Sequence, residues 1–330
     1  MPIYDKKAAG KQLMASLPEE RVSNPVCFEI TGVDFAGPFD IKNFVGRRCI
    51  ITKGYVCLFV CFATKAIHLE ATTDLSSATF LAAFSRFVGR RGCPAKIYSD
   101  NGTNFVGASK ELKKEYKLFL KQSSDLVLST YSHQGISWHF NPPGAPHMGG
   151  LWEAGVKSFK HHFRRVAGNM KYTLEEFTTL LVKIEACLNS RPLCPQSENP
   201  DDLTALTAGH FLTGRLLLAP CESKIDEQPL AIINRWRRVK AIYQHFCARW
   251  KSEYLLELQK RYKWKTQREN LKVNDLVVIM EDNLPPHEWR LGRVVEVHLG
   301  RDQNVRVASI KTEKGVVKRP VVKLVFLPPN

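Results

Sequence analysis

An unbroken apolar run at residues 56–62 constrains the fold more than any other part of the sequence. Its composition, Val-Cys-Leu-Phe-Val-Cys-Phe, favours a strand with both faces covered, as in the centre of an α/β sheet. Segments 47–52 and 66–72, on either side, are also rich in β-forming residues, with turn residues at 52–54 and 64–65. These segments together predict a strand meander at the centre of the fold.

Strand and helix patterns alternate around this meander. A first strand is expected at 27–33. After the meander come a helix at 76–91, a strand at 95–99, a lysine-rich helix at 110–121, a strand at 136–140 and helices at 151–166 and 172–189. This order predicts an α/β core over residues 26–192, a usual size for a domain.

Local patterns specify where two helices begin and which side of a third is buried. Ser76 or Ser77 is expected to cap the helix at 76–91, and Thr173 with Glu176 matches a capping box. Five apolar residues farther along follow the 3,4 spacing of a core stripe: Trp236, Val239, Tyr243, Phe246 and Trp250. Stacking of these aromatic rings on bases is the alternative.

The remaining chain divides by composition. Residues 1–25 are polar and aperiodic, and are expected to form a leader or linker, whereas 193–230 is a Pro-rich connection. Residues 231–268 form a basic helical segment. From 269 to 330, short β-type runs separated by turns predict a small β-barrel.

The charge of the chain points to a polyanionic partner. The net charge is +16, and residues 231–265 carry ten Lys/Arg against two Glu, which gives 10 − 2 = +8. Nucleic acid is the simplest such partner because neutralised phosphates release counterions, although ribosomal and membrane-surface roles share this composition.

Other features narrow the class of protein. No stretch approaches the roughly 20 apolar residues that span a bilayer, and residues 1–17 lack the apolar region of a secretory signal, so an intracellular protein with no membrane partner is expected. Its nine cysteines are scattered, which favours reduced thiols. No Cys-x2-Cys pair faces a His pair, so no zinc site is expected.

Three carboxylates fall where elements meet turns. Asp34 is expected at the end of the first strand, before Gly37-Pro38, and Asp100 follows the strand at 95–99, before Asn101-Gly102. Glu153 lies in the first turn of the helix behind the Pro/Gly-rich loop 141–150. Asp100 alone would be interpreted as a turn or helix cap. Convergence of the three would instead create an oxygen-ligand site for two Mg²⁺ or Mn²⁺ ions roughly 3.5–4 Å apart.

Blocks 34–39, 100–105 and 142–153 resemble the three signature blocks of retroviral and retrotransposon integrases, and the BEL/Pao class of LTR retrotransposons most of all. Segments 189–192 and 203–211 also resemble blocks of that class. The resemblance implies a ribonuclease H-like core, with a mixed five-stranded sheet and flanking helices, followed by the basic helix and an SH3-like β-barrel. It implies that Asp34, Asp100 and Glu153 are the catalytic metal ligands.

The same resemblance implies a set of DNA contacts. Lys157 and Lys160 would lie on one face of the helix that carries Glu153, although lysines at such positions usually form a solvated face. Asn101 and Asn104 would shape the metal-site turn, and His147 belongs to the loop that closes over DNA. Apart from the resemblance, the basic face of the segment 231–265 is expected to contribute phosphate contacts, with three arginines: Arg235, Arg237 and Arg238.

The sequence therefore predicts a Mg²⁺-dependent DNA integrase that acts in the nucleus as a homo-oligomer on element ends and target DNA. A second hypothesis is a retained retrotransposon fragment that only binds DNA, because the His2Cys2 zinc domain of integrases is missing from this sequence. A third is a ribonuclease H, which would share the fold and the metals.

Overall fold

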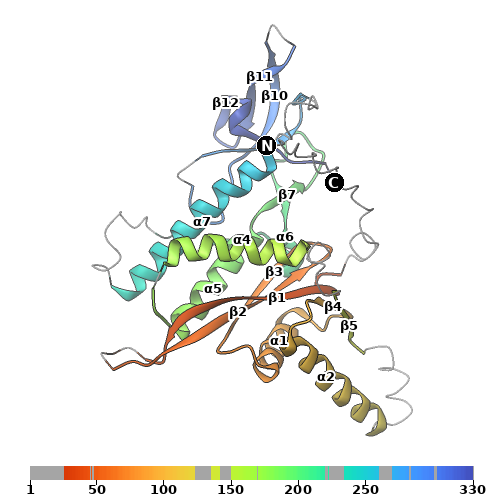
Figure 1. Ribbon diagram of the computed structural model, residues 1–330. Coiled ribbons are helices and arrows are strands. Elements are labelled where there is room, and N and C mark those ends of the chain that lie inside the picture. The colour runs from red at the N-terminus through yellow and green to blue at the C-terminus, as the bar shows by residue number, and fades with distance from the viewer. Residues whose placement is uncertain are drawn as a thin grey trace, which may run out of the picture.

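The computed structural model describes most of the chain (Figure 1). The described residues are 26–44, 46, 48–122, 135–141, 150–168, 170–219, 222, 234–259, 270–281, 284–300 and 303–329, with the backbone alone at 119–122, 150–154, 156 and 157.

A mixed sheet and its helices form the first part of the fold. Its elements are β1 (Ile30–Lys42), β2 (Ile51–Cys61), β3 (Ile67–Thr72), α1 (Ser77–Arg91), β4 (Lys96–Ser99), α2 (Thr103–Gln122), β5 (Ser137–Phe140), α4 (Gly150–Ala167), β6 (Tyr172–Thr173) and α5 (Leu174–Asn189). The strand order is β3-β2-β1-β4-β5, and β6 pairs with the far end of β1. The strands β1, β2 and β3 are antiparallel, whereas β4 and β5 run parallel to β1. This mixed α/β architecture is compatible with the ribonuclease H-like core that the sequence predicts.

Helices cover both faces of the sheet, which explains why residues 56–61 of β2 are all apolar. Figure 1 shows α4 and α5 on one side and α1 and α2 on the other. The residues of β2 alternate between the two cores: Leu58 and Val60 join the α4 and α5 side, and Cys57 and Phe59 join the α1 and α2 side. The prediction of a central strand covered on both faces is confirmed.

The two predicted helix starts are confirmed. The Ser76 side chain accepts a hydrogen bond from the Thr79 amide at the start of α1. At the start of α5, the Thr173 hydroxyl accepts from the Glu176 amide, while the Glu176 carboxylate accepts from the Thr173 amide. Both contacts satisfy helix-terminal amides that have no intrahelical partner.

Two predicted turns in the first strands were wrong. The strand that carries Asp34 does not end there, because Gly37-Pro38 is accommodated as a bulge, with a register shift between Ala36 and Phe39. Residues 52–54 lie within β2, where Gly54 has a packing role: a Cβ atom there would lie 2.5 Å from Cγ1 of Ile41. The glycine permits close contact between strands.

The Pro-rich connection is more regular than the sequence predicts. Strands β7 (Pro192–Pro195) and β8 (Ala205–Thr207) form an antiparallel pair, and α6 (Ala208–Thr213) follows. Tyr254 donates a hydrogen bond to the carbonyl of Pro192, so this segment is fixed to the C-terminal part of the chain.

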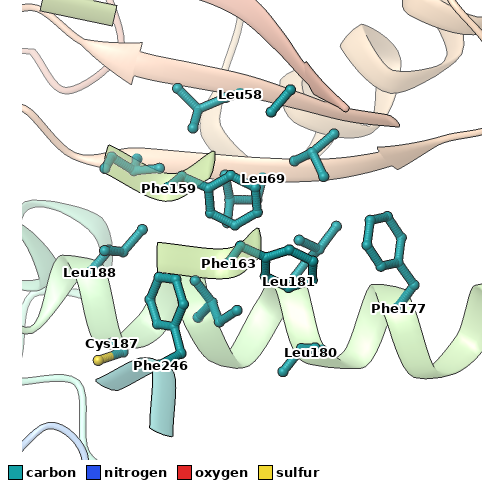
Figure 2. Close-up of a cluster of buried hydrophobic side chains, with 14 of the residues drawn as sticks. Leu58, Leu69, Phe159, Phe163, Phe177, Leu180, Leu181, Cys187, Leu188 and Phe246 are labelled. Carbon is teal, nitrogen blue, oxygen red and sulfur yellow. The ribbon is translucent and has the colours of Figure 1, made fainter. Parts of the chain in front are cut away.

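Helix α7 (Arg235–Gln259) forms a further layer over α4 and α5. Figure 2 shows Phe246 of α7 beside Phe159 and Phe163 of α4, within the cluster that reaches the sheet. The predicted core stripe is confirmed at Val239, Tyr243, Phe246 and Trp250, which are buried. Trp236 was wrongly included, since 56% of its surface is exposed and its ring lies 5.7 Å from the Lys183 ammonium.

The C-terminal residues form a second, antiparallel sheet. Its strands are β9 (Leu276–Ile279), β10 (Leu291–Leu299), β11 (Val305–Thr312), β12 (Gly315–Pro320) and β13 (Leu324–Phe326), with a 3-10 turn at Val321–Lys323. The order is β12-β11-β10-β9-β13. Within the described ranges the strand pairs do not join β12 to β13, so closure into a barrel stays a prediction.

A search of the described helices finds none that is both long enough and apolar enough to cross a membrane.

The position of Phe246 predicts how strongly α7 stabilises the core. The substitution Phe246→Ala should lower the free energy of unfolding by about 3–5 kcal/mol, because it leaves a cavity between α4, α5 and α7. Leu256→Ala, at a half-exposed position of the same helix, should cost about 0.5 kcal/mol or less. Urea denaturation of both variants measures the difference, and equal losses would contradict the packing of α7 into the core.

Candidate active site

The register of two parallel strands brings Asp34 and Asp100 together. Strand β1 pairs with β4 at a constant offset of 66 residues, from Ile30↔Lys96 to Gly32↔Tyr98. The same offset places Asp100, the residue after β4, beside Asp34 in the interior of β1. Asp34 is half-buried and Asp100 is exposed. Asp34, within β1, and Asp100, directly after β4, were predicted from separate parts of the sequence, and the register continued two residues past Tyr98 sets them opposite each other.

Both carboxylates belong to the face of the sheet that α4 covers. Paired residues of antiparallel strands point to the same side, and Asp34 pairs with Leu58, whose side chain lies in the core under α4 and α5. Tyr98, two residues before Asp100, packs against that same cluster. Asp34 and Asp100 therefore share one face at the place where β1 and β4 part.

The N-terminal half of α4 approaches that face. A Cβ atom at Gly155 would lie 3.6 Å from Leu58 and 3.4 Å from Val60. Farther along α4, Arg164 donates to the carbonyl of Gly37 in the β1 bulge at 3.3 Å. The backbone of Glu153 is thus two residues from a contact with the strand that neighbours Asp34. Its side chain lies outside the described residues.

The turn after β4 is held by its own polar groups. Oδ1 of Asp100 accepts a hydrogen bond from the Gly102 amide at 2.9 Å, and Nδ2 of Asn101 donates to the carbonyl of Asn141, after β5. A Cβ atom at Gly102 would lie 2.6 Å from Oδ1 of Asn104, so glycine allows the turn to close. The turn chemistry expected of Asp100 is present, and it orients the carboxylate.

Beneath this turn, a buried contact fixes its start. Nε1 of Trp138 donates to the Ser99 hydroxyl at 2.9 Å, and that hydroxyl donates to the Asp100 carbonyl at 2.8 Å. Sequence reasoning missed this link, because nothing in the sequence pairs a tryptophan of one strand with a serine of the next.

The chemistry of the three carboxylates suits a hard divalent cation, which prefers oxygen ligands. Among the side chains that the structure describes, no group of three or more His, Cys, Asp or Glu is arranged to hold a metal ion, and the Glu153 side chain is not one of them. The structure therefore describes the side chains of Asp34 and Asp100, and of Glu153 the backbone alone.

The expected DNA contacts have different environments. Lys160 is half-buried on α4 and Arg237 is exposed on α7. Nε of Arg235 donates to Oε1 of Glu176 at 2.7 Å, so its guanidinium is already paired. Arg238 is half-buried with an ionic or polar partner. His147 and the Lys157 side chain lie outside the described residues.

A second group of ionisable residues lies away from these carboxylates. His68 of β3 is buried between Glu70, at 3.0 Å, and Glu185 of α5, at 3.2 Å. Arg86 and Arg90 of α1 pair with Glu70 at 2.6 and 2.8 Å, and Arg91 pairs with Glu185. The Glu185 carboxylate also accepts the amide of Leu69 at 2.8 Å. This network ties α1, β3 and α5 together, and sequence reasoning missed it.

The network shifts the pKa values of its members in opposite directions. Burial alone would lower the pKa of His68, but hydrogen bonds to Glu185 and Glu70 outweigh it and raise the pKa above 6.5. Burial would raise the pKa of Glu70, whereas hydrogen bonds from His68 and Arg86 lower it below 4.5. Both shifts favour the ion pair.

Comparisons with known proteins add one family match and one structural likeness. Residues 234–327 match the model of a family described as one of unknown function, DUF5641. No curated protein matches the chain. The chain is similar to a chain in the cryo-EM structure of the simian T-cell lymphotropic virus intasome in complex with PP2A regulatory subunit B56 gamma. That match has 11% identity, covers 92% of this chain and 80% of the other, and has a TM-score of 0.37.

A TM-score of 0.37 is too low to establish a shared fold. The strand order and register of this protein define a mixed α/β fold, and residues 234–327, which follow it, match the DUF5641 model.

The His68 network predicts a stability difference that depends on pH. Since its pKa is raised, the contribution of His68 is fully present below its unfolded pKa near 6.5 and is lost as pH rises through the folded pKa. The contribution of Glu70 is present above about 4.5 and is lost as pH falls through its lowered pKa. His68→Gln should therefore destabilise the protein most between these values, by about 1–3 kcal/mol.

Urea unfolding at pH 5.5 and pH 9 measures the effect. The exposed His245 provides the matched substitution, His245→Gln. The His68 penalty should be smaller at pH 9, and a penalty that is constant or rises with pH would contradict the ion pair.

Proposed function

We propose that this protein is an integrase-like polynucleotidyl transferase that processes DNA ends and joins them to a target DNA strand. The proposal is supported by the parallel pairing of β1 with β4, whose offset, continued two residues past Tyr98, sets Asp100 opposite Asp34. Glu153 lies in the first turn of α4, a helix that packs on β1 and β2. Metal-dependent phosphoryl-transfer sites need carboxylates gathered in this way from distant parts of a chain.

In this proposal Asp34, Asp100 and Glu153 hold two Mg²⁺ or Mn²⁺ ions. When bound, such ions lower the pKa of an attacking water or hydroxyl and stabilise the leaving oxygen of a phosphodiester. The donor set fits, because carboxylate oxygens are hard ligands. The rest of the chain supplies rigidity: the Gly102 amide orients Asp100, and the Asn101 contact with Asn141 holds the turn against the end of β5.

The basic residues would position the DNA. Lys157 and Lys160 of α4 lie one and two turns beyond Glu153, and would contact phosphates near the reacting strand. Arg237 of α7 is exposed and available for a phosphate, whereas Arg235 is engaged by Glu176. Phosphate contacts of this kind fix the register of the DNA and carry no sequence information.

The finer assignments rest on the sequence blocks. We assign the core to the BEL/Pao class of integrases with a ribonuclease H-like fold, the C-terminal sheet to an SH3-like barrel, and the working form to a homo-oligomer on DNA in the nucleus. His147 would lie in the loop that closes over the DNA.

Experiments can distinguish the proposed integrase from two other functions. A fragment that only binds DNA is favoured by the basic α7, and would bind DNA ends without cutting or joining them. A ribonuclease H would share the carboxylates, and would cleave the RNA strand of an RNA/DNA hybrid, which an integrase should leave intact.

Replacement of a proposed metal ligand tests the catalytic site. Asp100→Asn should reduce Mg²⁺-dependent strand transfer more than about 100-fold, which corresponds to about 2.7 kcal/mol of transition-state stabilisation. Asp40→Asn is a matched control on β1, because Asp40 pairs with Lys53 at 2.6 Å away from the site. A gel assay with paired DNA ends measures joined product. If Asp100→Asn kept wild-type activity, the site assignment would fail.

Salt dependence tests the proposed phosphate contact. Arg237→Ala should lower the slope of log affinity against log salt by about 0.9, the value for one phosphate contact on duplex DNA. Arg235→Ala should leave the slope unchanged, because its guanidinium already pairs with Glu176. Fluorescence anisotropy at several salt concentrations measures both. The reverse pattern would place the phosphate at Arg235.

A further inference from the structure

Three aromatic rings form a stacked row across the sheet, on the face to which Asp34 and Asp100 belong. The ring of Phe62, directly after β2, stacks on that of Tyr98 in β4, with 4.9 Å between the ring centres and 29° between the ring planes. Tyr98 in turn stacks on His139 of β5, at 4.8 Å and 15°. The proposed metal chemistry gives none of these rings a role.

The row runs from the core to the solvent. Phe62 is buried, Tyr98 is half-buried and His139 is exposed. Among the described strands, β5 is the last on this side of the sheet (Figure 1). One face of the His139 ring is covered by Tyr98, and the opposite face is directed away from β4. The row therefore ends in an accessible aromatic face.

The strand that carries His139 is held firmly in place. All four residues of β5 pair with β4. On the opposite face of the sheet, the buried Trp138 donates its indole N–H to the Ser99 hydroxyl at 2.9 Å. The Ser137 hydroxyl lies 3.0 Å from Nε2 of His139 and forms a hydrogen bond with it, which orients the ring. Because the ring is ordered in advance, little freedom is lost when a ligand binds to it.

The row also lies close to the proposed metal ligands. Tyr98 and His139 are paired residues of parallel strands, and Asp100 follows Tyr98 by two residues, which corresponds to about 7 Å along a strand. Helices α4 and α5 pack chiefly on β1, β2 and β3, and they leave His139 exposed. A nucleotide whose phosphate lay at Asp34 and Asp100 would therefore have its sugar and base near the His139 ring.

An accessible aromatic face beside a phosphate site suits a nucleotide base, because bases stack on aromatic side chains, including histidine. Within a duplex, both faces of a base are already covered by its neighbours. An unpaired base at the end of a strand can offer a face at the least cost in unstacking. The ligand that best fits this place is thus a nucleotide that is not part of the duplex.

We propose that the His139 ring, backed by Tyr98, stacks on an unpaired base next to the phosphodiester that the carboxylates hold. The site then prefers DNA ends with unpaired nucleotides over blunt ends. This inference rests on the proposed function, because it takes the phosphodiester to lie at Asp34 and Asp100. His139 positions the substrate and determines specificity, and it takes no part in the transfer of protons.

Quenching of a fluorescent base tests the contact. The probe is a DNA duplex with a short unpaired end that carries 2-aminopurine, titrated with the full-length protein with Ca²⁺ in place of Mg²⁺. Stacking quenches 2-aminopurine, so we expect the fluorescence of the bound probe to fall at least about 3-fold. The same base paired within a blunt duplex should change little. Unchanged fluorescence of an unpaired probe that is bound by anisotropy would overturn the inference.

Variants separate stacking from a purely structural role of the ring. His139→Ala should weaken binding of the unpaired end about 5- to 100-fold, the range for one base stacked on an aromatic side chain, and should leave binding of the blunt duplex unchanged. His139→Tyr retains a flat ring and should keep the preference. His245→Ala, at an exposed position of α7, is the control. Equal losses for the two DNAs, or no loss for either, would contradict stacking. If His139→Ala does not fold, the quenching by the wild-type protein still decides the outcome.

The stacking site and the proposed function can fail separately. A wild-type protein that quenches the unpaired probe but joins no DNA ends with Mg²⁺ would contradict the proposed function and leave the stacking contact in place. A protein that joins DNA ends, and whose His139→Ala variant keeps the full preference for unpaired ends, would overturn the stacking site alone.

Discussion

The parallel pairing of β1 with β4 is the constraint on which the candidate site depends. Three residue pairs at one offset determine which residues of the two strands are neighbours, and that offset sets Asp34 beside Asp100. A shift of one residue would turn one of these carboxylates to the opposite face. The aromatic cluster of α1 with β1 and β2, and the Trp138 contact with Ser99, help to hold these strands in register.

The layer formed by α4, α5 and α7 has two roles. It buries the apolar side of the sheet, and it positions the start of α4 over β2 next to Asp34. The polar bridge of Asn189 to the backbone of Ile67, together with the Arg191 contacts to the Leu188 and Lys65 carbonyls, fixes the end of α5 against β3. The site is thus supported by a hydrophobic layer on one side and by buried hydrogen bonds at the edge of that layer.

Local patterns predicted the elements well, and long-range pairings could not be predicted. The spacing of Phe80, Phe84 and Phe87, and the capping box of α5, depend on residues within one or two turns, so they were accessible in the sequence. The Gly37-Pro38 pair was misinterpreted as a turn. Such a pair ends a strand or forms a bulge depending on whether the neighbouring strand continues to pair beyond it, as β2 does here. The placement of Asp34 at a strand end failed for the same reason.

Clusters of ionisable residues that come from distant parts of the chain were also not predictable from local sequence patterns. His68 looks like an ordinary polar residue of a strand until Glu185 and Arg91 approach it from two helices. Asp34 and Asp100 were predicted as parts of one site from their expected places at strand ends, and the resemblance to known sequence blocks made that prediction specific. Their adjacency is a property of the β1 and β4 register, which no local pattern encodes.

The region that matches DUF5641 begins at residue 234 and therefore includes the whole of α7. Much of the apolar side of α7 is covered by α4 and α5. If the protein were cleaved before residue 234 and the parts separated, the apolar surface of α7 and that of α4 and α5 would both become exposed to solvent. The region that matches DUF5641 thus combines a helix whose apolar side is covered by α4 and α5 with a C-terminal sheet that has a core of its own. In this protein the helix of that region therefore depends on the surface that α4 and α5 provide.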